Sequence, residues 1–591
     1  MSLHPNELQR RGRSAGILAA IALGVLLAAF FRVQVVEHAD FALQSDDNRL
    51  NEVPLPAPRG MILDRNGQVL AENIPGYSVS ILSPGRDSLR ATLQRLSAIL
   101  PLSDSAIEVV IKRFRAAPSR PAVILTDASF EQVSTLEEER SRFPSLVIQA
   151  APKRHYPGGT AVAALVGYTG EINEAELATE AYKDYKPGQQ IGRAGLEREY
   201  EAVLHGKDGS RFVEVDARGR VVRQAGARPD RIPEAGPDMR TTIDLDLQRF
   251  TASLFDSTMQ GGAVAMDPTT GAVLALHSAP IFDPNDFIGG ISSKTYQALR
   301  SDPRRPLYNK ALQGRYPPAS TFKLATAIIA LEQGVVGLGD RMPQTCNGSY
   351  QFGTRAFRCW EKKGHGSLTL AQAIEKSCDV YFYQLGLRLG LDRFLAGGVK
   401  LGFRRPSGID LPEENSPGWP EATSYYDKVY GKGGWTNAVT LNLAIGQGEN
   451  DQTVLSMARF YSAIATDGNA VRPHVVDRPV ERTKLFDLTP EQMAGLREAL
   501  HGVVSARGTA ASAAIKGVEL AGKTGTGQNS QNRAKDHAWF VGFAPKNDPK
   551  IVVAVMVAFG EHGYIAARIA SKMIERYLKA TVIQPLNVIG G

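Results

Sequence analysis

Two residues in the stretch GRYPPASTFKLATAIIALEQG could together perform nucleophilic chemistry. Ser320 follows Pro317 and Pro318 at the predicted start of a helix, and Lys323 lies three positions later. Residues at i and i+3 share a helix face and are about 4.5 Å apart along the axis, so the amine can reach the hydroxyl oxygen. A serine hydroxyl is a poor nucleophile without a base. A lysine can be that base when burial or a nearby cation favours its neutral form.

Ser-x-x-Lys alone is a weak signal, because it also fits an N-cap serine followed by a solvated lysine. Two further patterns follow it along the chain: Ser377-Cys378-Asp379 in KSCDVYF and Lys523-Thr-Gly in GKTGTG. In this order the three match the signature of penicillin-interacting serine acyl transferases, whose middle pattern is Ser-x-Asn or a variant of it. The ordered triplet predicts acyl transfer through a serine.

Longer segments resemble the class B penicillin-binding proteins. RGMILDRNGQVLAEN, GRAGLEREYEAVLHGKDG and GPDMRTTIDLDLQ resemble the pedestal module of that family. NKALQGRYPPASTFK, LAIGQGENDQTVLSMARFYSAIATDGNAVRPH and DHAWFVGFAP resemble its catalytic domain. Nothing before residue 236 resembles the acidic signature of a glycosyltransferase module, which disfavours the bifunctional class A proteins. Asp379 stands where many relatives have Asn, and this favours the elongation-type branch over the septal one.

The resemblance implies a role for each residue of the triplet. It makes Ser320 the acyl-accepting nucleophile and Lys323 its base, with Ser377 and Lys523 moving protons towards the leaving amine. The backbone N–H groups of Ser320 and Thr526 are then expected to form an oxyanion hole, which agrees with the need for pre-placed donors. The catalytic set is therefore Ser320, Lys323, Ser377, Asp379 and Lys523, and the substrate-binding set is Thr524, Gly525 and Thr526.

The three cysteines, Cys346, Cys359 and Cys378, lie close together in the sequence with His365 among them. Three thiolates and one imidazole make a complete tetrahedral structural zinc site, although the spacing is not that of a zinc finger. Some elongation-type relatives resemble this arrangement and bind a metal through Asp, His and Cys residues. The alternatives are a Cys346 to Cys359 disulfide with Cys378 free, or three unrelated core residues. On a helix through SLTLAQAIEKSCD, Ser377 would face the cleft while Cys378 anchors the helix to the zinc ion.

Several turns predict the elements that position these residues. Asp64 to Gly67 is turn chemistry between two apolar runs, and GGAVAMDPTTGAVLAL predicts two strands joined at Asp267 to Gly271. HAWFVGFAPKNDPKIVVAVMVAF repeats the pattern around Asn547 to Pro549. Strands at both ends of a helical middle predict an α+β fold, in which helices flank one antiparallel sheet. The predicted domains are a tail (1–13), an anchor (14–36), a mixed pedestal (37–236) and a transpeptidase domain (237–591).

An uncharged apolar run from Ser14 to Phe31 follows Arg10, Arg11 and Arg13, and it is long enough to span a bilayer with the residues after Arg32. A cleaved signal peptide is the alternative, but no small-x-small cleavage site follows the run. The positive-inside rule leaves the tail in the cytoplasm and predicts a bacterial inner-membrane protein with a periplasmic catalytic domain. The net charge of +7 over 591 residues is mild, and no basic-aromatic run predicts nucleic-acid binding.

The resemblance implies a D,D-transpeptidase that cross-links stem peptides of peptidoglycan strands during cell elongation and is the target of β-lactams. It also implies two partners: a RodA-like glycan polymerase of the shape, elongation, division and sporulation class, and an MreC-like scaffold. The alternatives are a septal-type transpeptidase, a carboxypeptidase or β-lactamase that uses water as acceptor, and a penicillin-sensing receptor. Carboxypeptidases and β-lactamases are usually smaller and lack the pedestal, and such receptors carry several membrane spans.

Overall fold

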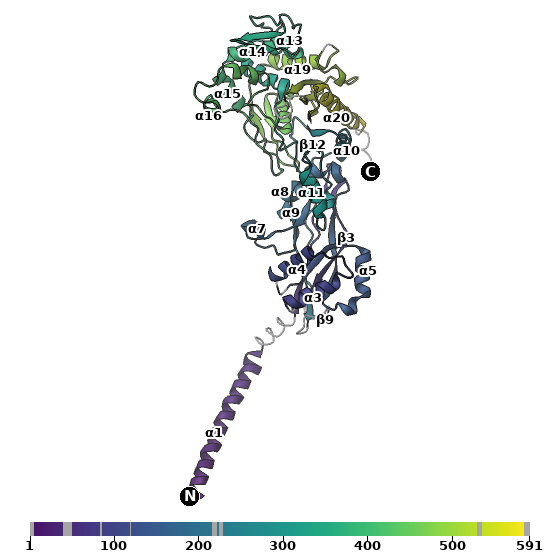
Figure 1. The fold of residues 1–591 in the computed structure, drawn as a ribbon, viewed down its shortest axis with the longest axis vertical. Helices are drawn as coiled ribbons and strands as arrows, with labels where there is room; N and C mark the ends of the chain where they lie inside the picture. The colour runs from purple at the N-terminus through teal and green to yellow at the C-terminus, as the bar shows by residue number, and fades with distance from the viewer. Residues whose placement is uncertain are drawn as a thin grey trace, which may run out of the picture.

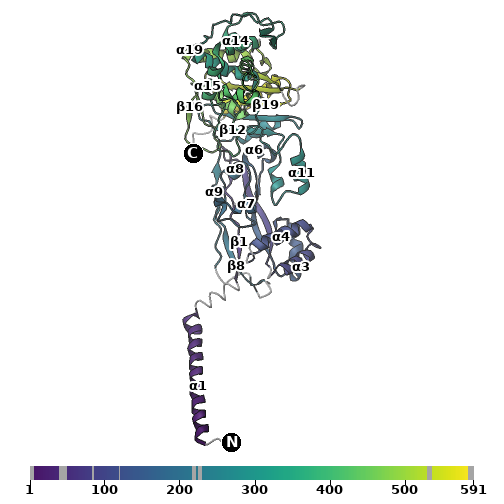
Figure 2. The same ribbon diagram turned by 60° about the vertical axis from the view of Figure 1, so that its left-hand side comes forward.

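The molecule is elongated, with a lone helix at one end and the largest domain at the other (Figures 1 and 2). This computed structural model describes residues 5–38, 50–82, 85–116, 118, 120–215, 221–223, 229–506, 508–528 and 535–583. Residues 1–4 of the predicted tail, residues 39–49 of the predicted pedestal and the chain end from 584 lie outside the described residues.

The N-terminal helix α1 runs from Pro5 to Phe31 and continues as a π-helical turn, η1, from Arg32 to Val36. Within its segment Gln9–Val36, an 18-residue stretch has a mean hydropathy of 2.4, and none of that stretch is buried against the rest of the chain. No other helix among the described ranges is both long and apolar enough to cross a membrane. The helix therefore has the length and composition expected of the predicted single anchor, while the predicted limits of the tail and anchor stay predictions.

The pedestal is built on the long strand β3 (Val69–Ile81), which pairs antiparallel with β2 (Ile62–Leu63), β4 (Ala122–Ala128) and β5 (Leu146–His155). The predicted hairpin is confirmed, because the Asp64 carboxylate accepts N–H groups inside the turn between β2 and β3. The remaining pedestal elements are β1 (Leu50–Leu55), α3 (Arg86–Leu96), α4 (Asp104–Ala116), α5 (Phe130–Glu138), η2 (Arg140–Arg142), η3 (Gly159–Ala161), α6 (Ala163–Val166), β6 (Thr169–Glu171), α7 (Glu174–Leu177), η4 (Glu180–Tyr182), β7 (Gln190–Gly192), α8 (Gly195–Glu199), α9 (Glu201–Leu204), β8 (Gly209–Val215), β9 (Val221–Arg223) and β10 (Met239–Arg240).

The catalytic domain contains one five-stranded antiparallel sheet in the order β12-β11-β19-β18-β17. Its strands are β11 (Gln260–Met266), β12 (Val273–Ala279), β17 (Ala521–Gly527), β18 (His537–Ala544) and β19 (Ile551–Ala558). Both predicted hairpins, β11 to β12 and β18 to β19, are present. The predicted α+β fold with an antiparallel sheet is therefore confirmed.

Helices cover both faces of this sheet, which explains why the central strand β19 is apolar at every position. Val553 and Val555 pack with α20 (Gly563–Ile583) on one face. Ala554 and Met556 pack on the other face, in the same core as α18 (Val454–Ala465). Side chains alternate between faces along a strand, so a strand buried on both sides needs a continuous apolar run.

The remaining elements form a helical lobe and its connections to the sheet. They are α10 (Leu245–Ser253), η5 (Pro284–Phe287), α11 (Ser293–Ser301), η6 (Ala319–Phe322), α12 (Lys323–Glu332), β13 (Ser349–Phe352), β14 (Arg355–Arg358), α13 (Leu370–Glu375), α14 (Asp379–Leu389), α15 (Leu391–Lys400), α16 (Ser424–Tyr430), α17 (Ala438–Ala444), β15 (Asn469–Val471), β16 (Arg482–Lys484), α19 (Pro490–Val504) and η7 (Ala511–Ala513). The η6 turn lies against β17, so the lobe and the sheet edge meet where the three sequence patterns occur.

Candidate active site

Ser320 lies in the short 3₁₀ turn η6, directly before α12, and its side chain is partly exposed. The preceding Ala319 has a φ of 50°, a left-handed conformation that is costly for a residue with a Cβ atom. Its N–H donates to the carbonyl oxygen of Gly446 at 2.9 Å. A Cβ at Gly446 would meet the Ala319 carbonyl oxygen at 2.2 Å, so only glycine allows this approach. The turn is thus strained, and the hydrogen bond to Gly446 fixes its position, as expected where a reactive side chain must be held in place.

Lys323 is the first residue of α12 and is fully buried. Its Nζ donates to Asp379 Oδ1 at 2.7 Å, to the Ser377 carbonyl oxygen at 2.8 Å and to Ser377 Oγ at 3.3 Å. These contacts bring the first and second sequence patterns together. In the described part of the chain, the amine has these partners and no hydrogen bond joins it to Ser320.

The prediction that Ser377 and Cys378 lie within one helix is wrong. Helix α13 ends at Glu375, and α14 begins at Asp379. Ser377 has a φ of 54°, and the N–H of Cys378 donates to the Ala373 carbonyl oxygen at 3.0 Å. This is a Schellman-type helix end with serine where glycine is usual. The break turns the Ser377 side chain towards Lys323 and leaves Asp379 in the first turn of the next helix, where a carboxylate is favoured.

The third pattern lies on β17, the edge strand of the sheet. Lys523 is fully buried, and this burial, with the charge of Lys323 adding to it, holds the pKa of Lys523 well below its ordinary value. A Cβ at Gly525 would lie 2.9 Å from the Pro318 carbonyl oxygen, so glycine lets the strand approach the Ser320 turn. The hydroxyl groups of Thr524 and Thr509 share a hydrogen bond, and Thr526 is exposed. The open strand edge beside Ser320 can pair with an extended peptide.

The structure thus places all eight predicted catalytic and substrate-binding residues around one location. They come from η6 and the start of α12, from the turn between α13 and α14 and the first residue of α14, and from β17. The sequence reasoning missed Trp360, whose backbone N–H donates to Asp379 Oδ2 at 3.0 Å. No sequence signal could have found this contact, because a backbone N–H is present at every residue except proline.

Cys346, Cys359, His365 and Cys378 form a second cluster directly behind the Ser377 turn. Their four donor atoms all lie within 4.8 Å of one another, and the three cysteines are buried free thiols rather than a disulfide. A hydrogen bond from the Cys378 thiol, together with one from His365, holds the pKa of the Cys359 thiol below its ordinary value. The proximity of Cys359 and burial raise the pKa of Cys378.

The geometry of this cluster fits a tetrahedral zinc ion. His365 Nδ1 lies 3.5 Å from Cys359 Sγ and 3.7 Å from Cys346 Sγ. Zinc–sulfur bonds of about 2.3 Å and zinc–nitrogen bonds of about 2.0 Å, at tetrahedral angles, separate N and S ligands by about 3.5 Å. The donor set is also complete for a closed structural site. The residues present therefore fit zinc.

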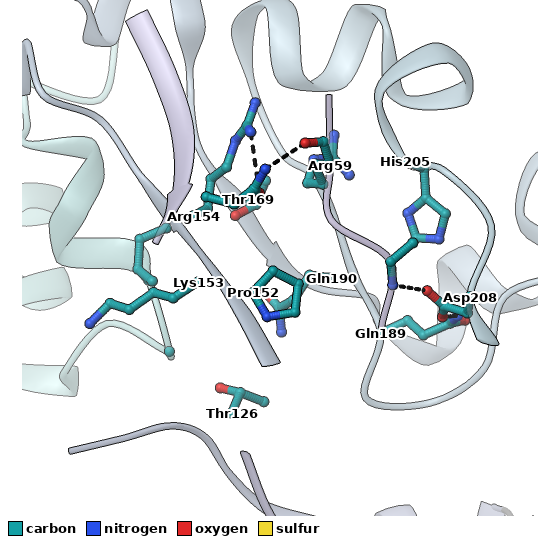
Figure 3. A pocket seen from close by; sticks show the side chains of 14 residues that line it. Arg59, Thr126, Pro152, Lys153, Arg154, Thr169, Gln189, Gln190, His205 and Asp208 are labelled. Carbon is teal, nitrogen blue, oxygen red and sulfur yellow. Dashed lines mark hydrogen bonds between the residues drawn. The ribbon is translucent and has the colours of Figure 1, made fainter. Parts of the chain in front are cut away.

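A cavity of about 90 Å³ is lined mainly by pedestal residues, together with Ile288 and Gly289 of the catalytic domain, and by none of the predicted site residues. Figure 3 shows its lining, which includes Arg59, Arg154, Gln190 and Asp208. The two arginines are buried and form ion pairs with Glu197 at 2.8 and 2.6 Å. Because these arginines are already paired with a buried carboxylate, they have a structural role here rather than a catalytic one.

Two family models match the chain. The penicillin binding protein transpeptidase domain covers residues 261–575, and the penicillin-binding protein dimerisation domain covers residues 54–241. The Peptidoglycan D,D-transpeptidase MrdA of Acinetobacter baumannii is 33% identical, over 96% of this chain and 88% of that relative. The protein of the same name from Escherichia coli K12 is 32% identical, over 96% of this chain and 94% of that relative.

Solved structures give the same result. The complex between penicillin-binding protein PBP2 and MreC from Helicobacter pylori has a TM-score of 0.79 at 27% identity, over 90% of this chain and 100% of that chain. Pseudomonas aeruginosa PBP2 in complex with WCK 5153 has a TM-score of 0.66 at 31% identity, over 89% of this chain and 96% of that chain. The chain therefore belongs to the class B penicillin-binding proteins. Its similarity to proteins called MrdA and PBP2 supports the elongation-type branch of that family.

Proposed function

We propose that the chain is an elongation-type peptidoglycan D,D-transpeptidase that forms an acyl-enzyme on Ser320. The observation that carries the proposal is the buried Lys323 amine, which follows Ser320 by one helical turn and contacts both Ser377 and Asp379. Two distant parts of the chain thus meet at the Lys323 amine, and β17 adds a third where Gly525 approaches the Ser320 turn, which is the arrangement required for an activated nucleophile.

The reaction then follows from the residues in place. Ser320 Oγ attacks the carbonyl carbon of the penultimate D-alanine, and the hydroxyl proton passes to the Lys323 amine, which accepts it in its neutral form. The bond to the terminal D-alanine breaks, and its nitrogen takes a proton through Ser377 and Lys523. The amine of a second stem peptide attacks the ester, forms the cross-link and returns a proton to the serine. Catalytic hydrogen bonds often form or tighten only when substrate binds, so the lack of a Lys323–Ser320 bond among the described residues is compatible with this role.

β17 supplies the binding surface for the donor peptide in this proposal. Thr524 and Thr526 hold the terminal carboxylate, and Gly525 keeps the strand close to the Ser320 turn. The N–H groups of Ser320 and Thr526 stabilise the oxyanion. Hydrogen bonds from pre-placed donors are worth most on a charge that develops in the transition state.

The function is tested by analysing products from pentapeptide-bearing glycan strands. The wild-type protein is expected to release D-alanine and form dimeric cross-links, and Ser320→Ala is expected to form none. Release of D-alanine without dimers would instead identify a carboxypeptidase. Cross-linking that persists in Ser320→Ala would refute the assigned nucleophile.

We also propose that Cys346, Cys359, His365 and Cys378 bind one structural zinc ion. A bound ion stabilises the folded state by its binding free energy, so it would hold the turn that carries Ser377. Elemental analysis of protein purified without chelator should find about one zinc per chain, falling sharply in Cys359→Ser. Metal-free protein with three titratable thiols would refute the site. Thermal unfolding with and without chelator measures its contribution to stability without relying on activity.

We further propose that α1 anchors the protein in the bacterial cytoplasmic membrane with its catalytic domain on the periplasmic side. The arginines before the apolar run support this orientation. Similar structures include PBP2 with MreC and a peptidoglycan synthase complex described as coordinating polymerization and crosslinking. A RodA-like glycan polymerase and an MreC-like scaffold are therefore the proposed partners. Co-purification with each candidate from membranes, with and without α1, tests these contacts.

A further inference from the structure

Trp360, in the loop after β14, is an exposed aromatic side chain fixed beside the catalytic turn. It is 54% exposed, yet its indole N–H donates to the carbonyl oxygens of Lys376 and Ser377, both at 3.1 Å. Its backbone N–H donates to Asp379 Oδ2. These bonds keep the indole from turning away, so one aromatic surface stays presented to solvent next to the turn that carries Ser377.

The loop that carries Trp360 is also held in shape. The N–H of Cys359 donates to the Gly348 carbonyl oxygen at 2.8 Å, and that of Gly364 donates to the Glu361 carbonyl oxygen at 3.0 Å. The Trp360 ring meets the His365 ring edge to face, with centroids 5.2 Å apart. A preformed surface loses little conformational entropy when it binds a ligand.

The last residue of β14 and the loop after it carry three cations. Arg358, Lys362 and Lys363 are exposed, and none of them forms an ion pair with any residue in the described ranges. The neighbouring Glu361 carboxylate accepts the backbone N–H of Lys363 at 3.1 Å. The three cations are therefore free to attract an anion, and they lie within three positions of Trp360 in the sequence.

We propose that Arg358, Trp360, Lys362 and Lys363 form a subsite for the carboxylate-bearing stem peptides and sugars of a glycan strand during cross-linking. This rests on the proposed function, because the strand is the substrate of that reaction. The cations pair with stem-peptide carboxylates, and the indole covers an apolar face of the sugar or peptide. An anionic membrane is a poor match: Figure 1 shows α13 and α14, which flank the catalytic turn, at the end of the molecule opposite α1, and Figure 2 shows α14 there as well.

This subsite contributes to cross-linking of the glycan strand and not to acylation by a small drug. A penicillin needs only the Ser320 site, whereas a glycan strand extends beyond it. Contacts between exposed charges are weakened by salt. Cross-linking should therefore depend on the loop cations and on ionic strength, while penicillin acylation depends on neither.

The experiment uses the full chain with its partner polymerase and a lipid-linked precursor. Lys362→Glu with Lys363→Glu is expected to lower the cross-linking rate about tenfold, with penicillin acylation kept within about twofold. Lys362→Gln with Lys363→Gln should lower cross-linking less and flatten its salt dependence. The matched control is Lys294→Glu with Lys516→Glu, which changes the net charge equally at exposed lysines outside the loop.

Cross-linking within twofold of the control in both loop variants would overturn the subsite. If the Glu pair also loses penicillin acylation, it has disturbed the fold, and the salt dependence of the Gln pair decides the question. A wild-type protein that takes up no penicillin would refute the proposed function instead, so the two failures are distinguishable.

Discussion

Replacing Asp379 by asparagine tests the ion pair at the centre of the site. The carboxylate is buried and has two donors facing it: Lys323 Nζ on Oδ1 at 2.7 Å and the Trp360 N–H on Oδ2 at 3.0 Å. Asparagine keeps the shape but offers a single acceptor oxygen. In either orientation its NH₂ group faces a donor, so one hydrogen bond is lost and the buried Lys323 charge loses its partner.

The magnitude follows from these two losses. A hydrogen bond to a charged group is worth about 1.5–3 kcal/mol, and breaking a buried ion pair costs about 3–5 kcal/mol. One bond survives in asparagine, so the free energy of unfolding should fall by about 2–4 kcal/mol. For a domain of about 350 residues this lowers Tm by about 3–5 °C. Acylation should slow about 100-fold, because the amine is no longer held between the two motifs.

The assays are thermal unfolding and the second-order rate of acylation by a labelled penicillin. Asp392→Asn is the matched control, because Asp392 also lies in the first turn of a helix, α15, but is exposed. The control removes the same favourable interaction with a helix N-terminus without breaking an ion pair. If Asp379→Asn loses no more stability and rate than Asp392→Asn, the ion pair does not organise the site.

Three further predictions use buried or strained positions. At pH values between the lowered pKa of folded Lys523 and its pKa in the unfolded chain, the unfolded chain binds more protons, so the free energy of unfolding should rise with pH. Lys523→Met should remove that slope, as measured by denaturant titrations at several pH values. In the same titrations, Ser377→Gly should be more stable than Ser377→Ala by about 1 kcal/mol, because glycine adopts the positive φ without a steric cost. Both variants should slow acylation. Equal stabilities would show that the turn is unstrained. Gly446→Ala should lose far more acylation than Gly431→Ala, since both have a positive φ but only a Cβ at 446 meets the Ala319 carbonyl oxygen.

The sheet was predictable from the sequence because its signals are local. The turn at Asp267 to Gly271 and the turn at Asn547 to Pro549 each lie between apolar runs. Turn residues fix where strands reverse, and the runs fix what must be buried. The ordered catalytic patterns likewise identified residues from distant segments that the fold brings together.

The conformation at Ser377 was not predictable, because nothing local marks it. A serine followed by cysteine and aspartate continues a helical pattern as well as it ends one. The helix breaks because Lys323, from another segment, bonds both the Ser377 carbonyl oxygen and Asp379. The role of Trp360 is equally non-local, because its hydrogen bonds go to Lys376, Ser377 and Asp379, which lie 16 to 19 positions further along the chain. Tertiary contacts of this kind override local preference at functional sites.

The central claim is that Ser320 is the residue acylated, and peptide mapping tests it most directly. The protein is incubated with a labelled penicillin, digested and analysed by mass spectrometry. We predict one adduct per chain, on the peptide that contains Ser320, and no adduct in Ser320→Ala. An adduct on another peptide, or one that persists in the variant, would contradict the account.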